Sequence, residues 1–186
     1  DGFLKWVRDQ GLKVTLNLHP AAGVGKHEAA FDNVARHTGL DPDSVDNVPF
    51  DCTDPRYVET YFKDIHHPLE RRGVDFWWID WQQGTSLKHG KMPSVDPRPW
   101  LKYLHWIDME RNAERRGLRP MLFSRWGKLG SHRYQIGFSG DTYNNWESLA
   151  FQPYFTSTAA NVAYPFWSHD IGGHMPGPVE PELYAR

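Results

Sequence analysis

The chain has little of several features that define other classes of protein. Its 186 residues include one cysteine, Cys52, which excludes an internal disulfide. It has no basic run, no heptad repeat and no apolar stretch of the roughly 18 residues that a membrane span needs. Its net charge of −2 gives no sign of nucleic acid or an anionic membrane as a partner. The sequence therefore predicts no nucleic-acid partner and no membrane segment in this chain.

Glycine-rich nucleotide motifs are also missing. Neither Gly-x-Gly-x-x-Gly nor Gly-x-x-x-x-Gly-Lys-Ser/Thr follows any expected strand, so nucleotide binding has no support. The 39% hydrophobic content is ample for a core, and we interpret most of the nine tryptophans as core packing. The chain begins at Asp1 and stops at Arg186, shortly after Pro181 opens a helical pattern. We expect a fragment with truncated ends, and its localisation stays open because no signal peptide is visible.

Amphipathic helices alternate with short apolar strands along the chain. Asp54-Pro55 and Asp96-Pro97 each supply an N-cap followed by proline at the first helical position. A further helix is expected from about residue 146 to 160. This alternation predicts a parallel α/β architecture. The expected strands lie at about 12–18, 74–79, 119–124, 134–139 and 162–168.

The strand count suggests an incomplete barrel. A complete (β/α)8 TIM barrel takes about 250 residues, and this chain supplies five strands in 186. We predict a partial (β/α)8 barrel with about five of the eight strands, in which residues 1–186 form the central to C-terminal part of a catalytic domain with truncated ends. An open doubly wound sheet is the competing interpretation. Segments 20–53 and 81–95 lack periodicity, and we expect them to be long loops after strands.

Two expected strands each end at a carboxylate. The apolar run 73–79 stops at Asp80, and residues 134–140 lead into Asp141. Barrel enzymes place catalytic groups at the carboxyl ends of their strands. Retaining glycosidases need two carboxylates, one as nucleophile and one as acid and then base. From spacing alone, acids at strand ends can also cap helices or bind metal.

Other polar residues follow the later strands. Arg125 comes after the strand that ends at Ser124, and it can hold a carboxylate ionised, donate to sugar hydroxyls or form a structural ion pair. Asp170 precedes Gly172 and Gly173, whose lack of a side chain lets the backbone pass close to a ligand or a neighbouring strand.

The histidines allow a different chemistry. His19, His169 and Asp170, together with Asp80, are possible ligands of a divalent metal at a barrel mouth. No pair has a recognised ligand spacing. A metal-dependent barrel hydrolase therefore stays an alternative, and so does a non-catalytic sugar-binding protein. His66 and His67 lie in an expected helix, and we expect them to pack or to be solvated.

Three motifs in this order resemble the catalytic barrel of glycoside hydrolase family 31, the α-glucosidase and α-xylosidase family. Trp78-Ile79-Asp80 resembles its nucleophile strand. His169-Asp170-Ile171-Gly172-Gly173 resembles its Asp-Ile-Gly-Gly element. Its arginine strand and acid/base strand are matched by Ser124-Arg125, Gly130-Ser131-His132-Arg133-Tyr134, Gly140-Asp141 and Trp146.

The resemblance implies double displacement with retention, in which Asp80 is the nucleophile and Asp141 the general acid/base. It implies a carbohydrate substrate and no metal or organic cofactor. The expected substrate-binding residues are Arg125, Asp170, Trp78, Phe138, Trp81 and His19.

Two segments depart from the family pattern. Trp81-Gln82-Gln83-Gly84 follows Asp80, where α-glucosidases commonly continue with Met-Asn-Glu. Asn17-Leu18-His19-Pro20 differs from the Asp-Pro often seen near that point. Both segments border the expected site, so the sugar stays open among α-glucose, α-xylose, α-galactose and α-N-acetylgalactosamine.

Overall fold

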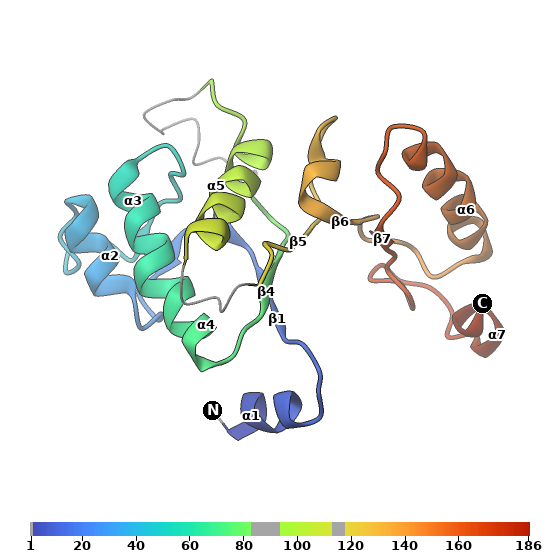
Figure 1. Ribbon diagram of the computed structural model, residues 1–186, viewed down its shortest axis with the longest axis horizontal. Coiled ribbons are helices and arrows are strands. Elements are labelled where there is room, and N and C mark those ends of the chain that lie inside the picture. The colour runs from blue at the N-terminus through green and yellow to red at the C-terminus, as the bar shows by residue number, and fades with distance from the viewer. Residues whose placement is uncertain (1, 83–93, 113–117) are drawn as a thin grey trace. The chain divides into compact units, whose positions relative to one another are not determined.

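The computed structural model describes residues 2–82, 94–112 and 118–186 (Figure 1). The chain forms two compact units, Asp1–Leu122 and Phe123–Arg186. Its five main strands follow the order β1-β4-β5-β6-β7, and the pairs β1/β4 and β6/β7 are parallel. The predicted α/β class and the five strands are therefore confirmed. No described helix is long and apolar enough to cross a membrane.

The first unit builds its sheet from two strands far apart in sequence. Strand β1 pairs with β4 so that Thr15 lies opposite Phe76 and Leu18 opposite Ile79. Both strands are shorter than expected. The elements of this unit are α1 (Gly2–Asp9), β1 (Thr15–Leu18), η1 (Pro20–Ala22), β2 (Val24–Gly25), α2 (Phe31–Thr38), β3 (Asn47–Val48), α3 (Pro55–Thr60), π-helix η2 (Tyr61–His66), α4 (His67–Arg72), β4 (Phe76–Ile79) and α5 (Pro97–Arg111), and β5 (Leu122–Ser124) begins at its end.

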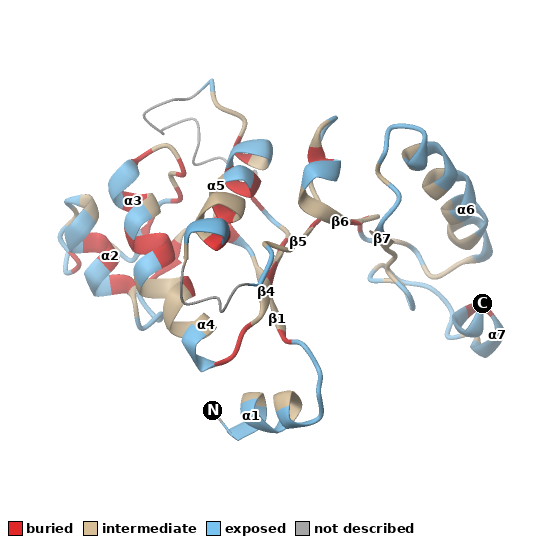
Figure 2. Cartoon of the chain, viewed as in Figure 1, coloured by how far each residue is buried: buried red, intermediate tan, exposed pale blue. Residues whose placement is uncertain are grey.

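The core of the first unit lies between β4 and the helices (Figure 2). Trp77 and Ile79 of β4 are completely buried, as is Leu122 of β5, and Leu101 of α5 is almost so. Alternate residues of a strand face opposite sides of a sheet, so this burial turns Trp78 to the other face. Asp80, two residues after Trp78, lies on that same face.

The helix starts predicted from Asp-Pro pairs are confirmed. The Asp54 side chain accepts a hydrogen bond from the Arg56 N–H at 2.9 Å, and that of Asp96 accepts one from the Arg98 N–H at 3.0 Å. Each satisfies a backbone donor that a helix start leaves without an internal partner. Gly73 ends α4 with a positive φ of 122°, which favours glycine.

The expectation of a structureless loop over 20–53 was wrong. This segment contains helix α2 and a small antiparallel pair, β2 and β3. Phe31, Val34 and Ala35 of α2 are buried, at the i, i+3 and i+4 spacing of a helix face. Most of the second expected loop, residues 83–93 of 81–95, lies outside the described residues.

The second unit contains η5 (Ser131–Tyr134), β6 (Gln135–Phe138), α6 (Trp146–Ala160), β7 (Trp167–Ser168) and α7 (Pro181–Ala185). Helix α6 begins and ends where the sequence predicted. None of its residues is buried, and Phe151 and Tyr154 are 53% and 68% exposed. Its N-cap is Asn145, whose side chain accepts from the Ser148 N–H at 2.8 Å.

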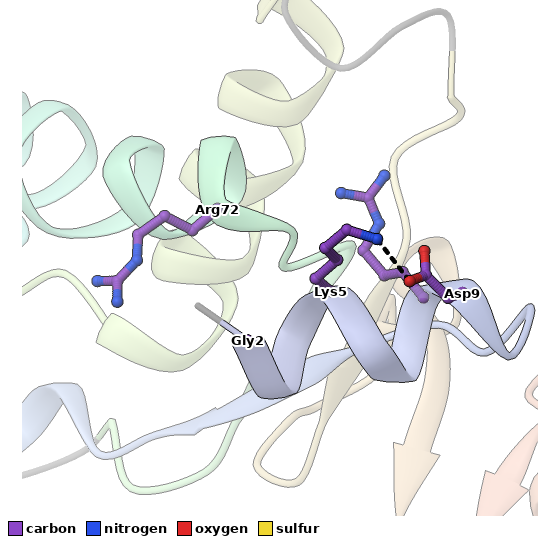
Figure 3. Close-up of a pocket in the computed structure, with 5 residues that line it drawn as sticks. Gly2, Lys5, Asp9 and Arg72 are labelled. Carbon is purple, nitrogen blue, oxygen red and sulfur yellow. Dashed lines mark hydrogen bonds and ion pairs between the residues drawn. The ribbon is translucent and has the colours of Figure 1, made fainter.

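A charged cavity lies beside α1 in the first unit (Figure 3). Its volume is about 630 Å³, and a 2.6 Å ion pair joins Lys5 to Asp9 in its wall. Arg8 and Arg72, which also line it, come from helices that precede β1 and β4. Barrel enzymes carry their active sites at the opposite, carboxyl ends of the strands. This cavity is therefore not the candidate active site.

Candidate active site

Asp80 directly follows the last residue of β4. Its backbone N–H donates to the Leu18 carbonyl at 3.0 Å, which continues the β1–β4 pairing by one residue. Asp80 therefore lies at the carboxyl end of a parallel strand pair, as predicted. Its side chain is 15% exposed, so the carboxylate is largely shielded and its chain position is fixed by the sheet.

Three predicted substrate-binding residues lie near Asp80 in sequence or space. His19 follows β1, and its Nε2 lies 3.5 Å from Asp80 Oδ2. Trp78 shares a strand face with Asp80 because the two are separated by one residue. Trp81 is 46% exposed, and its carbonyl accepts a hydrogen bond from the Ala21 N–H at 2.9 Å. That bond ties the segment after β4 to the segment after β1.

Gln82 anchors the segment after Asp80, a contact that the sequence did not reveal. It is completely buried, and its Nε2 donates to the Arg98 carbonyl at 2.9 Å. The bond links the segment after Asp80 to the first turn of α5. The sequence marked Gln82 only as a departure from the family pattern, because a glutamine in an aperiodic segment gives no signal of burial. The next two residues of that departure, Gln83 and Gly84, lie outside the described residues.

Asp141 follows β6 in the second unit, where an ion pair holds it. Arg125 Nη1 lies 3.1 Å from Asp141 Oδ1, and the two side chains are 17% and 34% exposed. The Arg125 guanidinium also lies over the Trp126 ring, at 4.6 Å from its centroid, and 6.0 Å from the Phe138 centroid. These contacts hold the Arg125 guanidinium against aromatic rings and beside the Asp141 carboxylate.

Glycines shape the backbone around Asp141. Gly140 has a φ of 98°, so it supplies the left-handed turn between Phe138 and Asp141. A Cβ on Gly137 would lie 2.5 Å from Cζ3 of Trp167. The β6–β7 packing therefore requires glycine at this position.

Asp170 fixes the segment that begins at Asp141. Its Oδ2 accepts hydrogen bonds from the backbone N–H groups of Thr142 at 3.0 Å and His174 at 2.8 Å. Gly173 follows with a φ of 71°, and a Cβ there would lie 3.0 Å from the Asn144 nitrogen. The glycine after Asp170 thus permits the close approach that the sequence predicted, and its neighbour is the segment after Asp141.

His169 is held in one tautomer. The Thr156 hydroxyl donates to the Gln152 carbonyl at 2.8 Å, so it accepts from His169 Nε2–H at 3.1 Å. Burial lowers the pKa of His169 below its ordinary value. The side chain lines a cavity of about 630 Å³ in the second unit, together with Asp170 and Asn145.

Two residues of the metal alternative have other partners in the structure. His169 bonds to Thr156, and Asp170 accepts from backbone N–H groups, whereas His19 contacts Asp80, which belongs to the same proposed set. Within the described chain, the three-residue group whose ligand atoms have the spacing for a metal ion is His67, Glu70 and Asp108. The expectation that His66 and His67 are packed or solvated is confirmed for His66, which is 1% exposed.

Parallel strands that alternate with helices, with carboxylates after the strand ends, define a protein of the α/β-barrel class. Comparison with known proteins identifies the family. The profile of the glycosyl hydrolases family 31 TIM-barrel domain matches residues 1–186. The chain therefore belongs to glycoside hydrolase family 31, as its motifs predicted.

Two curated relatives and one solved structure are similar to this chain. An α-xylosidase of Emericella nidulans is 23% identical over 202 residues, which cover 100% of this chain and 25% of that protein. A 1,3-α-isomaltosidase of Kribbella flavida is 35% identical over 80 residues, 42% of this chain and 10% of that protein. The cycloalternan-degrading enzyme of Trueperella pyogenes, solved with cycloalternan, shares the fold with a TM-score of 0.71 and 18% identity, over 99% of this chain and 28% of that one.

Proposed function

We propose that this chain is part of a retaining α-glycoside hydrolase that removes the non-reducing terminal sugar of oligosaccharides or glycoconjugates. In this proposal residues 1–186 form the central to C-terminal part of its (β/α)8 catalytic domain. The proposal rests mainly on the positions of Asp80 and Asp141, each of which follows a strand of a parallel pair. The family barrel profile also matches the whole chain. The chain spans about a quarter or less of the length of the two curated relatives, so the activity of the whole protein is part of the proposal.

The proposed reaction has two displacement steps. First, the Asp80 carboxylate attacks the anomeric carbon, the bond from that carbon to the leaving oxygen breaks, and Asp141 donates a proton to that oxygen. Second, Asp141 takes a proton from water, the water oxygen bonds to the anomeric carbon, and the bond to Asp80 breaks. Two inversions release the α-anomer. The whole protein must then hold the two carboxylates about 5–5.5 Å apart.

The surroundings of both acids support sugar binding. Trp78 lies on the same strand face as Asp80, and an aromatic ring suits the apolar C–H face of a pyranose. Near Asp141, the Phe138 ring lies beside the Arg125 guanidinium. A guanidinium carries five N–H donors, so Arg125 can hold Asp141 and also contact sugar hydroxyls. We assign Asp170, Trp81 and His19 to the same sugar-binding set.

We propose the identity of the sugar from the names of the relatives and from the two segments that depart from the family pattern. Two relatives are named an α-xylosidase and a 1,3-α-isomaltosidase. We therefore place α-xylosides and α-glucosides first. His19 and Trp81 lie beside Asp80, and they are the residues we expect to decide between these sugars. α-Galactosides and α-N-acetylgalactosaminides belong in the same test.

The test uses the full-length enzyme and p-nitrophenyl α-glycosides of these four sugars, first without EDTA and then with EDTA added. Wild type is compared with Asp80→Asn and with Asp43→Asn, which changes an exposed aspartate of the first unit. We expect one sugar to be released by wild type and Asp43→Asn but not by Asp80→Asn. We also expect NMR to show the α-anomer as the first product, and a mechanism-based inhibitor to label Asp80.

Undiminished turnover by Asp80→Asn would refute its role as nucleophile. An immediate loss of turnover on adding EDTA would favour the metal-dependent alternative through His19, His169 and Asp170. Binding of sugars without hydrolysis of any would favour a non-catalytic relative. Release of the β-anomer would contradict retention while leaving the class of enzyme in place.

A further inference from the structure

A second cluster of polar side chains lies between helices α4 and α5, apart from the candidate active site. His67 and Glu70 are three residues apart on α4, so they share one helix face. Asp108 comes from α5. One ligand atom from each lies within 4.8 Å of the others, and His67 Nε2 lies 3.0 Å and 3.1 Å from the two Asp108 oxygens.

We propose that His67, Glu70 and Asp108 bind one divalent metal ion of the zinc class, which ties α4 to α5. One imidazole nitrogen and two carboxylate oxygens suit Zn²⁺, and water completes a tetrahedral shell. With bonds of about 2.0–2.2 Å, the ligand atoms of such a shell lie about 3.4 Å apart. The three ligand atoms lie within 4.8 Å of one another, so they must approach by at most about 1.4 Å to reach that spacing. The ion replaces the proton on His67 Nε2, since a histidine ligand is neutral.

The surroundings of Glu70 provide a second, independent observation. Trp77 Nε1 donates to Glu70 Oε1 at 2.8 Å, and Asn112 Nδ2 donates to Oε2 at 3.1 Å. Carboxylates that bind metals are usually held in this way by outer hydrogen bonds, which fix their orientation. Trp77 is completely buried, so the core anchors one of these donors.

Charge and burial favour a cation at this position. The side chains of His67 and Asp108 are 24% and 18% exposed, so Asp108 and the nearby Glu70 are only partly hydrated. Partly hydrated carboxylates attract a divalent cation more strongly than fully hydrated ones do, because the effective dielectric constant around them is lower.

The location indicates a structural site rather than a catalytic one. Glu70 bonds to the Trp77 side chain, which faces the buried side of β4. Asp80 is three residues further on, so its side chain faces the opposite side of the strand. The proposed ion therefore lies across β4 from the Asp80 side chain, and it plays no part in the proposed hydrolysis.

Zinc binding by the full-length protein tests the proposal. After chelator treatment and dialysis, Zn²⁺ is titrated by calorimetry into wild type, His67→Gln, Glu70→Gln and the control His37→Gln. The control removes an exposed histidine that also faces a carboxylate, Glu59, at 3.3 Å. We expect wild type and control to bind one equivalent of zinc. Both test variants should bind zinc with an affinity at least about 100-fold lower. Zinc should also raise the melting temperature of wild type and control only.

A visible Co²⁺ absorption band that requires His67 gives a readout independent of stability. Equal zinc affinity in all four proteins would overturn the proposal, since any bound zinc would then lie elsewhere. It would also be overturned if His67→Gln lowered the melting temperature equally with and without zinc, as expected for a simple His67–Asp108 ion pair. Turnover measured with zinc present should be the same in wild type and His67→Gln. The zinc site and the role of Asp80 in hydrolysis can therefore be refuted independently of each other.

Discussion

Arg125 and Asp141 form an ion pair of 3.1 Å after two successive strands, β5 and β6. The pair couples the position of the proposed acid/base to a guanidinium that itself lies against Trp126. Neither residue is fully buried, so both can meet a substrate. Arg125 therefore has two proposed tasks, to hold Asp141 and to contact the sugar.

Replacement of Arg125 by lysine tests both tasks. Lysine keeps the charge but loses the planar set of donors, and we expect kcat/KM to fall by about 100-fold, the scale of losing one well-placed donor. Arg133→Lys, at an exposed position, serves as the control. Steady-state kinetics on the sugar identified above would measure the effect. A variant with wild-type kcat/KM would show that Arg125 has only a structural role.

Replacement of Asp170 separates a structural role from a sugar contact. In Asp170→Ala the N–H groups of Thr142 and His174 lose their acceptor, and we expect the free energy of unfolding to fall by about 2–3 kcal/mol. Asp170→Asn keeps an acceptor oxygen, so it should retain more stability. If Asp170 contacts the sugar through its charge, both variants lose activity. Full activity in Asp170→Asn would remove Asp170 from the substrate-binding set.

Gly137 should not tolerate a side chain. A Cβ there would lie 2.5 Å from Trp167 and 2.8 Å from the Tyr164 hydroxyl. We expect Gly137→Ala to lower the free energy of unfolding by about 1–3 kcal/mol through overpacking. Gly2→Ala is the control, since nothing lies within 4 Å of its Cβ position. Chemical unfolding would measure both, and equal stability would contradict the packing of β6 on β7.

His66 should make the first unit less stable in acid. Its Nδ1–H donates to the Tyr61 carbonyl at 2.5 Å, its Nε2 has no hydrogen-bond partner in the described chain, and burial lowers its pKa to about 4. Between pH 6.5 and 4 the unfolded state therefore binds a proton that the folded state does not. Stability is lost as pH falls through this window, by about 3 kcal/mol in total, at about 1.4 kcal/mol per pH unit.

The variant His66→Gln should lack this loss, while keeping an N–H donor for Tyr61. We expect the difference in unfolding free energy between wild type and variant to shrink by about 3 kcal/mol from pH 7 to pH 4. Urea unfolding at several pH values would measure it, with exposed His132→Gln as the control. A constant difference across this range would contradict the low pKa.

The sequence predicted the elements whose signals are local. Asp54-Pro55 and Asp96-Pro97 marked two helix starts correctly, and all five strands were located because short apolar runs alternate with helices. Helix α2 was missed although Phe31, Val34 and Ala35 carry a helix face. The reason is that glycine, proline and aspartate around this short segment dominated the interpretation. The π-helix Tyr61–His66 interrupts a helix that reads as continuous, and no residue pattern distinguishes it.

For the candidate site, the motifs predicted which residues belong to it but few of the groups that these residues bond to. The motifs located Asp80, Asp141, Arg125 and Asp170, yet the bonds from Asp170 to the Thr142 and His174 N–H groups depend on two loops folding against each other. The hydrogen bond from Gln82 to Arg98 could not be predicted from the sequence either, because its acceptor is a backbone carbonyl 16 residues away. The catalytic and binding roles of all these residues stay predictions.

The hydrogen bond from the Asp80 N–H to the Leu18 carbonyl limits how this protein can be altered. Because side chains alternate along a strand, adding or removing one residue between Gly73 and Asp80 would exchange the two faces of β4. Ile79 or Trp81 would then take the place of the carboxylate, and Trp77 would leave the core. Natural or designed variation in length should therefore be absent from the stretch between Gly73 and Asp80.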